Sequence, residues 1–167
     1  MDVDGLFHRL YPPLFRYLVR LTGDEDAADD AAQEAFVRLT KQPLPESEVR
    51  PWLFTVATNL VRDRARKAER HRRLQAHVPD GYQADAPDVS TERGERIARV
   101  RRALERVSER DRMMLLMREE GFRYDEIARA VDVAPGSVGT LLARAAKRFE
   151  KAYTEMRAEE TINGSSG

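Results

Sequence analysis

The densest cluster of ionisable side chains is a run of six acids in the stretch DEDAADDAAQE, from Asp24 to Glu34. Carboxylates this close together could act as a general acid and a general base. No histidine or nucleophile lies near them in the sequence, so the pattern favours another use. Acids stabilise the first turn of a helix, and acids on successive turns suit docking to a basic protein partner. We expect Asp30, Gln33 and Glu34 to form such a docking face, which would repel DNA.

Residues 51–78 carry the opposite charge, with seven basic and two acidic side chains and a net charge of +5. Placed on a helix at about 100° per residue, the segment from Pro51 has an apolar side and a polar side. The apolar side holds Leu53, Val56, Ala57, Leu60 and Val61, and the polar side holds Thr55, Asn59, Arg62, Asp63, Arg66, Arg70 and Arg73. A solvated helix face is one explanation. Solvated helices usually carry both signs of charge, however, so the excess of cations favours a polyanion such as nucleic acid.

The stretch YDEIARAVDVAPGSVGTLLARAAKRF predicts a helix-turn-helix, with a turn at Asp132 and Pro135 in the first turn of the second helix. Val138, Leu142, Ala145 and Phe149 should form the buried stripe of that second helix. Its outer face would carry Ser137, Thr140, Arg144, Lys147, Arg148 and Lys151. Hydrogen-bond donors, charges and small residues on one face suit entry into a DNA major groove. A helical hairpin with a merely cationic surface is the alternative.

Helical spacing and turn signals predict the elements that would position these three surfaces. Apolar residues recur at three-and-four spacing up to Leu21, Gly23 predicts a helix stop, and Asp24 can cap the next helix. KQPLPESEV predicts a loop before a third long helix that starts near Pro51. Residues 74–95 lack periodicity and predict a flexible linker. Ser108, three residues before Asp111, predicts another helix start, and the last seven residues, TINGSSG, predict a frayed end.

The composition of the 167-residue chain, with 41% hydrophobic and 35% charged residues, is typical of a helical protein. The absence of cysteine excludes disulfides and thiolate metal sites, and the three histidines are not spaced as ligands, so we expect no metal and no cofactor. No apolar run approaches the roughly 18 residues that suggest a membrane span, and no signal peptide is evident. We therefore expect a cytoplasmic protein without membrane insertion.

Both halves of the sequence resemble one family, the bacterial RNA polymerase sigma factors of the extracytoplasmic-function (ECF) type, within the sigma-70 family. LFHRLYPPLFRYLVRLTGDEDAADDAAQEAFVRL followed by RPWLFTVATNLVRDRARK resembles the second conserved region of the family. ALERVSERDRMMLLMREEGFRYDEIARAVDVAPGSVGTLLARAAKRF resembles the fourth. The resemblance implies an all-α protein of two small helical domains joined by a flexible linker. The expected boundaries are 1–73 for region 2, 74–95 for the linker, 96–157 for the region 4 helix-turn-helix and 158–167 for a disordered tail.

The resemblance also implies a function, which is to bind core RNA polymerase and direct it to promoters without catalysis by the chain itself. Asp30, Gln33 and Glu34 match the family's helix that docks on core polymerase. Asn59, Arg62 and Asp63 match the helix that recognises the minus-10 element, and Arg66 continues the same face. The loop 41–50 stands where the family captures an unpaired base. Ser137, Thr140 and Arg144 match contacts to the minus-35 element, with Lys147 and Arg148 beside them. Members are commonly held inactive by an anti-sigma factor, which makes such a protein a candidate partner.

Three residues depart from the family pattern. Gly139 and Leu141 stand where members often carry basic residues, and Arg123 stands where a small capping residue is usual. Fewer cations would lower the salt-dependent affinity for DNA, so we expect weaker minus-35 binding or a different set of contacts.

Two other classes of protein remain as alternatives. One is a stand-alone helix-turn-helix regulator that binds duplex DNA as a dimer. The other is a helical enzyme that uses the acidic helix with a metal, for which the scattered histidines give no ligand set.

Overall fold

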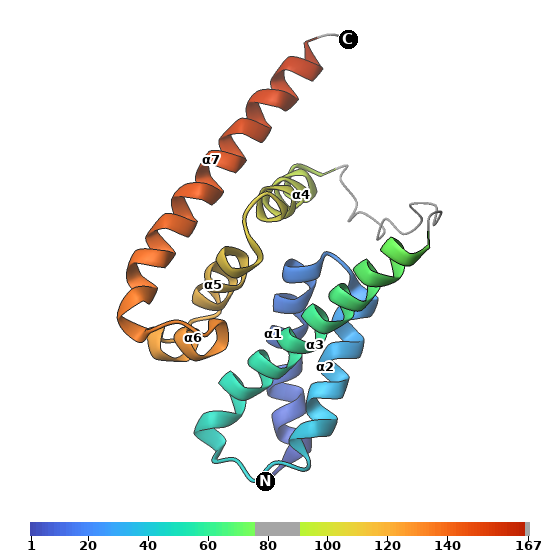
Figure 1. The fold of residues 1–167 in the computed structure, drawn as a ribbon, viewed down its shortest axis with the longest axis vertical. Coiled ribbons are helices and arrows are strands. Elements are labelled where there is room, and N and C mark those ends of the chain that lie inside the picture. The colour runs from blue at the N-terminus through green and yellow to red at the C-terminus, as the bar shows by residue number, and fades with distance from the viewer. Residues whose placement is uncertain (76–90, 166–167) are drawn as a thin grey trace. The chain divides into compact units, whose positions relative to one another are not determined.

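The computed structural model describes residues 1–75 and 91–165, and the chain divides into two compact units, Met1–Ala84 and Asp85–Gly167. The described residues form seven α-helices, one short 3-10 helix and no strand, which confirms the prediction of an all-α fold (Figure 1). The first unit holds α1 (Val3–Thr22), α2 (Glu25–Leu39) and α3 (Glu46–Leu74). The second holds α4 (Glu92–Glu105), α5 (Glu109–Glu119), α6 (Tyr124–Val131), η1 (Pro135–Ser137) and α7 (Val138–Gly164). Most of the predicted linker lies outside the described residues.

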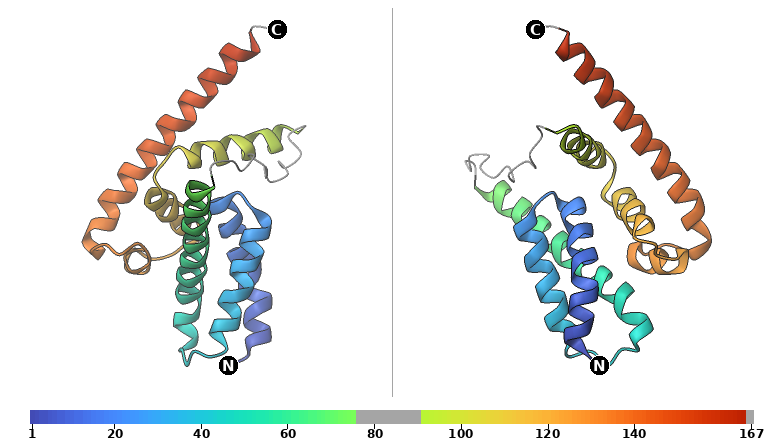
Figure 2. Two further views of the ribbon diagram at one scale, coloured as in Figure 1. Left: turned by 45° about the vertical axis from the view of Figure 1, so that its right-hand side comes forward. Right: turned by 180° about the vertical axis from the view of Figure 1, so that it is seen from behind.

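The first unit is a bundle of three helices, in which α1 and α2 lie side by side (Figure 2). Gly23 ends α1 in the left-handed conformation, with φ at 72°, and its N–H donates to the Val19 carbonyl at 2.7 Å. Asp24 then caps α2, because its Oδ1 accepts hydrogen bonds from the backbone N–H groups of Asp26 and Ala27 at 3.0 and 3.1 Å. Both helix boundaries that the sequence predicted here are confirmed.

The predicted start of α3 is wrong. The helix begins at Glu46 rather than near Pro51, so the loop after α2 shortens to residues 40–45. Two effects favour the earlier start. Acids in the first turn interact well with the positive end of the helix dipole, and the Val49 side chain is fully buried in the bundle. These gains outweigh the backbone hydrogen bond that Pro51 cannot donate within the helix.

The buried face of α3 is also rotated from the predicted one. After the first turn, the buried side chains are Leu53, Phe54, Ala57, Thr58 and Val61. Val56 and Leu60, which were expected in the core, are only half-buried. The centre of the buried face therefore turns by about 60°. Thr58 is accommodated because its hydroxyl donates to the Phe54 carbonyl at 2.6 Å and lies 2.9 Å from the Tyr17 hydroxyl.

In the second unit, α4 packs against the C-terminal half of α7. Small and flexible side chains fill this contact, namely Ala103, Ala152 and Met156. Ion pairs lie beside it, with Arg106 Nη2 at 2.9 Å from Glu159 Oε2 and Arg102 Nη2 at 2.6 Å from Glu160 Oε1. The hydrogen bond from Arg106 lowers the pKa of the Glu159 carboxyl below its ordinary value. These contacts explain why α7 continues to Gly164, whereas a disordered tail was expected from residue 158.

The helix-turn-helix consists of α6, η1 and the start of α7. Arg123 is the N-cap of α6, and its guanidinium has no acceptor atom for the N–H groups of the first turn. The reciprocal half of a capping box is present, because Glu126 Oε1 accepts from the Arg123 backbone N–H at 2.9 Å. Asp132 ends α6 in the left-handed conformation, with φ at 58°. The Val133 N–H then donates to the Ala128 carbonyl at 3.0 Å. This turn sends the chain into η1 and from there into α7.

Candidate nucleic-acid interface

The predicted docking residues lie on the outer face of α2. Asp30 and Gln33 are exposed, and the Glu34 side chain is 42% exposed. A row of buried alanines holds the opposite face of the helix against the bundle, namely Ala28, Ala31, Ala32 and Ala35. Because alanine is small, α2 approaches its neighbours closely, and Asp30, Gln33 and Glu34 lie on the side away from this contact. The structure therefore brings the three predicted docking residues to one surface.

All three side chains already have partners within the chain, and that of Gln33 is Asp29 on the same helix, whose Oδ2 accepts from Gln33 Nε2 at 2.8 Å. Glu34 Oε1 lies 3.0 Å from Arg38 Nε, one turn further along α2. Asp30 Oδ2 lies 3.7 Å from Arg64 Nη1 on α3. Exposed ion pairs of this kind contribute about 0–1 kcal/mol, so an incoming cation can replace either arginine at little cost. The acids remain available to a basic partner.

The predicted minus-10 residues lie along the outer side of α3. Asn59, Asp63 and Arg66 are exposed, Arg62 is half-buried, and Arg66 Nη1 lies 4.0 Å from Asp63 Oδ1. The rotated core of α3 is centred almost directly opposite Asn59. The rotation therefore moves the predicted polar face further from the core rather than toward it.

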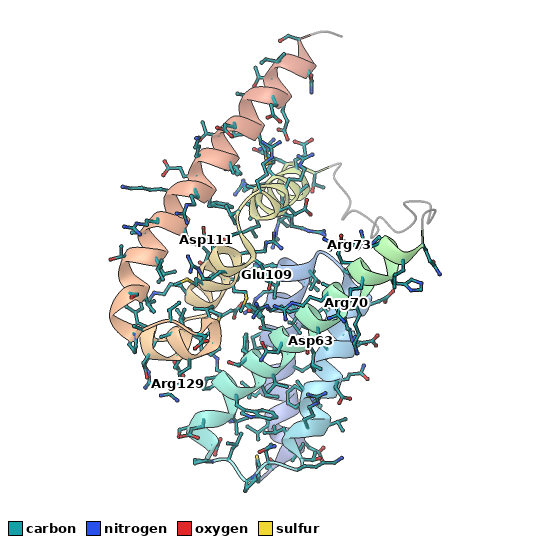
Figure 3. All side chains as sticks on the ribbon, in the orientation of Figure 1. Asp63, Arg70, Arg73, Glu109, Asp111 and Arg129 are labelled. Carbon is teal, nitrogen blue, oxygen red and sulfur yellow. The ribbon has the colours of Figure 1, made fainter. Side chains whose placement is uncertain are left out.

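Beyond Val61, α3 has no buried side chain among residues 62–75. All seven basic residues of the 51–78 block fall in this stretch, accompanied by only two acids, Asp63 and Glu69. Figure 3 shows Asp63, Arg70 and Arg73 spaced along this part of α3. A helix that is polar on every side gains little stability from packing. Packing therefore does not constrain these side chains, and their charges suit binding of a charged ligand. The Asp30–Arg64 contact places this basic stretch beside the acidic face of α2.

The predicted minus-35 residues lie around the first turns of α7. Thr140, Arg144 and Lys147 are exposed, and Ser137 is half-buried in η1. Arg148 has a different position, because its Nη1 lies 2.8 Å from Asp111 Oδ2 on α5. The structure thus brings four of the five predicted residues to one outer face and gives the fifth a partner inside the domain.

Sequence reasoning missed two residues of this domain. From the sequence, Asp111 was expected only to contribute, with Ser108, to the start of a helix, yet its side chain is 1% exposed. Its spacing of three residues from the buried Met114 is a signal that could have placed it on the inner face of α5. Tyr124, which is 43% exposed, lies against the first turn of α7: a β-carbon added at Gly139 would lie 3.5 Å from its ring. The Arg118 guanidinium stacks over the same ring at 5.0 Å.

Two further properties bear on what these surfaces do. Within residues 1–75 and 91–165, no three acidic or histidine side chains gather where they could hold a metal ion. Among the helices of those same residues, none is long and apolar enough to cross a membrane.

Comparison with known proteins gives the same two-part organisation. Residues 6–71 match the family model described as Sigma-70 region 2, and residues 97–149 match the one described as Sigma-70, region 4. The chain is 30% identical to the ECF RNA polymerase sigma factor SigL of Mycobacterium tuberculosis over 157 residues, which cover 86% of this chain and 84% of SigL. It is 26% identical to the RNA polymerase sigma factor YlaC of Bacillus subtilis over 168 residues, covering 96% of this chain and 97% of YlaC.

Two solved structures are similar in fold. One is the sigma factor RpoE of Bartonella quintana in complex with the anti-sigma factor NepR, with a TM-score of 0.72, 21% identity and coverage of 92% of this chain and 97% of that one. The other is a chain of the PhyRSL–NepR complex from Sphingomonas sp. Fr1, with a TM-score of 0.64, 25% identity and coverage of 92% and 90%.

Proposed function

Since the chain belongs to the ECF sigma factors of the sigma-70 family, we propose that three of its surfaces divide the work of promoter recognition. The outer face of α2 binds core RNA polymerase, α3 binds the minus-10 element, and α7 binds the minus-35 element. One observation carries this division. Within a single three-helix unit, an acidic face and a basic helix lie side by side, linked by the Asp30–Arg64 contact at 3.7 Å. Opposite charges this close suit two ligands of opposite charge, a basic protein surface and a nucleic acid.

Docking to core polymerase uses Asp30, Gln33 and Glu34. Their polar groups face solvent, while the buried alanines on the other side of α2 fix the direction in which they point. A rigid acidic face of this kind attracts a basic helical partner and sets its register. The same charge keeps DNA away from α2 and leaves it to α3.

Binding of the minus-10 element uses Asn59, Arg62, Asp63 and Arg66. The polar groups near Asn59 suit base edges, and the arginines that follow suit phosphates of the opened strand. The short loop at 40–45, with the first turn of α3, lies at the N-terminal end of the same helix. We assign to this loop the capture of an unpaired base, whose unstacking costs a few kcal/mol and is recovered in a pocket.

Binding of the minus-35 element uses the N-terminal part of α7. Ser137 and Thr140 offer hydroxyl groups, and Arg144 and Lys147 offer charge one and two turns further along. This order places small side chains where the helix enters the major groove and cations where phosphates flank it. Gly139 and Leu141 bring no charge to this face, which supports a minus-35 contact that is weaker than usual for the family.

The remaining partner in this proposal is an anti-sigma factor. The similar Bartonella sigma factor was solved in complex with the anti-sigma factor NepR, and a protein that covered α2 of this chain would block the docking face. The chain would act in the cytoplasm, where polymerase works, and would bring no catalytic group of its own.

Transcription in vitro tests the proposal. Core polymerase with this chain is incubated with a library of promoter fragments, and the start sites are mapped. We expect discrete start sites downstream of a shared minus-10 sequence. Asn59→Ala should reduce their use while leaving assembly with core polymerase intact. Start sites identical to those of core polymerase alone would contradict the proposal.

A further inference from the structure

One buried ionic contact in the second unit has no place in the function proposed so far. Among the residues that the structure describes, one charged residue is buried. It is Asp111, which is 1% exposed. Its Oδ2 lies 2.8 Å from Arg148 Nη1, and Figure 3 shows Asp111 on α5 next to α7. The contact joins residues that are 37 positions apart in the sequence.

The two partners depend on each other unequally. A buried carboxylate is costly unless a cation and hydrogen bonds compensate for the lost water. The start of α5 compensates the carboxylate only in part, because Asp111 lies in the first turn, at the positive end of the helix dipole, while its Oδ1 is buried without a hydrogen-bond partner among the described residues. Its main partner is Arg148, whose side chain is 55% exposed. Arg148 could return to solvent, whereas Asp111 could not, so the pair holds Arg148 in place.

The position of Arg148 around α7 differs from that of its neighbours. At about 100° per residue, Arg148 lies about 90° from the centre of the buried stripe formed by Val138, Leu142 and Ala145. Thr140 and Lys147 lie about 170° from the same centre, directly outward. A side chain at the edge of the buried stripe is well placed to fix the rotation of the helix about its axis. It is poorly placed to reach the phosphates that Lys147 faces.

We propose that Arg148 is a positioning residue for minus-35 recognition and contacts no phosphate. Its pair with Asp111 fixes the rotation of α7, so that Thr140 and Lys147 face the groove. The inference rests on the proposed role of α7 at the upstream element, and it removes Arg148 from the set of DNA-contacting cations that the sequence predicted.

The salt dependence of promoter binding separates a positioning role from a phosphate contact. Each phosphate contact to duplex DNA adds about 0.9 to the slope of log K against log salt concentration, whatever its effect on affinity. The assay is the binding of fluorescent promoter DNA by holoenzyme between about 50 and 200 mM salt. We expect Lys147→Gln to lower the slope by about 0.9. Arg148→Gln should weaken binding, because an unpaired α7 also misplaces Thr140 and Lys147, and Arg148→Lys should restore most of the affinity.

A neutral double variant keeps the test open if the single variant folds poorly. Asp111→Asn with Arg148→Gln removes both charges and preserves a hydrogen-bonding pair of similar size. We expect it to keep the wild-type slope. A slope lowered by about 0.9 in this variant would show that Arg148 contacts phosphate and would overturn the inference. If holoenzyme forms but Lys147→Gln also leaves the slope unchanged, the proposed role of α7 fails instead.

Discussion

The acidic face of α2 gives the sharpest quantitative prediction, for the double change of Asp30→Asn with Glu34→Gln. Among the residues that the structure describes, both carboxylates lie in exposed ion pairs, Asp30 at 3.7 Å from Arg64 and Glu34 at 3.0 Å from Arg38. The loss of the two pairs together should lower the free energy of unfolding by no more than about 2 kcal/mol. At an interface that excludes water, removing one partner of a charged pair costs about 2–5 kcal/mol. Core polymerase binding should therefore weaken by at least about 30-fold while the chain stays folded.

The assay is a competition experiment, in which unlabelled variants displace a fluorescent wild-type chain from core polymerase. Glu25→Gln with Asp4→Asn is a matched control, because both acids are exposed first-turn residues of the same unit, Asp4 on α1 and Glu25 on α2 about 140° around the helix from Asp30. It makes the same change in net charge and should lower the affinity less than about threefold, through long-range attraction alone. Equal losses in both variants would refute a specific docking face and leave only a general attraction between opposite charges.

Three further predictions concern the second unit. Thr140→Ser removes the side-chain methyl group, whereas Thr140→Val keeps it. If this methyl contacts thymine methyl groups, replacing minus-35 thymines with uracil should weaken promoter binding by the valine variant but not by the serine variant. Equal effects of uracil on both variants in binding titrations would exclude a methyl contact. Gly121 has a φ of 86° and open space around it, so Gly121→Ala should cost about 1 kcal/mol of unfolding free energy in denaturant titrations, and an unchanged midpoint would count against backbone strain. The pKa of Glu159 is lowered by Arg106, so its contribution to stability is complete above the ordinary glutamate pKa and is lost as the pH falls through the lowered value. The difference in melting temperature between wild type and Glu159→Gln should therefore shrink between about pH 6 and about pH 3, and a difference that grows would contradict the pairing.

Local signals allowed part of this fold to be predicted. Gly23, Asp24 and Ser108 each act on backbone groups two to four residues away, so their roles follow from the sequence alone. Of the buried stripe that periodicity predicted for α7, Val138, Leu142 and Ala145 are buried, and Phe149 is half-buried. Predictions of this kind succeed because the interacting groups are close neighbours in the chain.

The errors have a common physical cause, which is contact between distant segments. Pro51 marks a helix start by local rules, but the burial of Val49 in the bundle places the start earlier. Thr58 is buried because Tyr17, 41 residues away, offers it a hydroxyl partner. The last turns of α7 are held by pairs with α4 that span 53 and 58 residues. No local pattern contains this information.

In the candidate surfaces too, features that depend on neighbouring residues could be predicted, and features that depend on contacts between helices could not. The outward direction of Asp30, Asn59 and Thr140 could be predicted from helical spacing, because each lies opposite an apolar stripe. The link between Asp30 and Arg64 and the burial of Asp111 could not, because both depend on how two helices pack. These tertiary contacts decide which charges remain available to ligands.

The most direct test of the account is the formation of a complex between the purified chain and core RNA polymerase at low ionic strength. Size-exclusion chromatography with light scattering would measure the mass of that complex. We expect one chain per core enzyme and DNA-dependent initiation by the isolated complex. A chain that elutes alone, or that binds duplex DNA as a dimer without polymerase, would contradict the central claim.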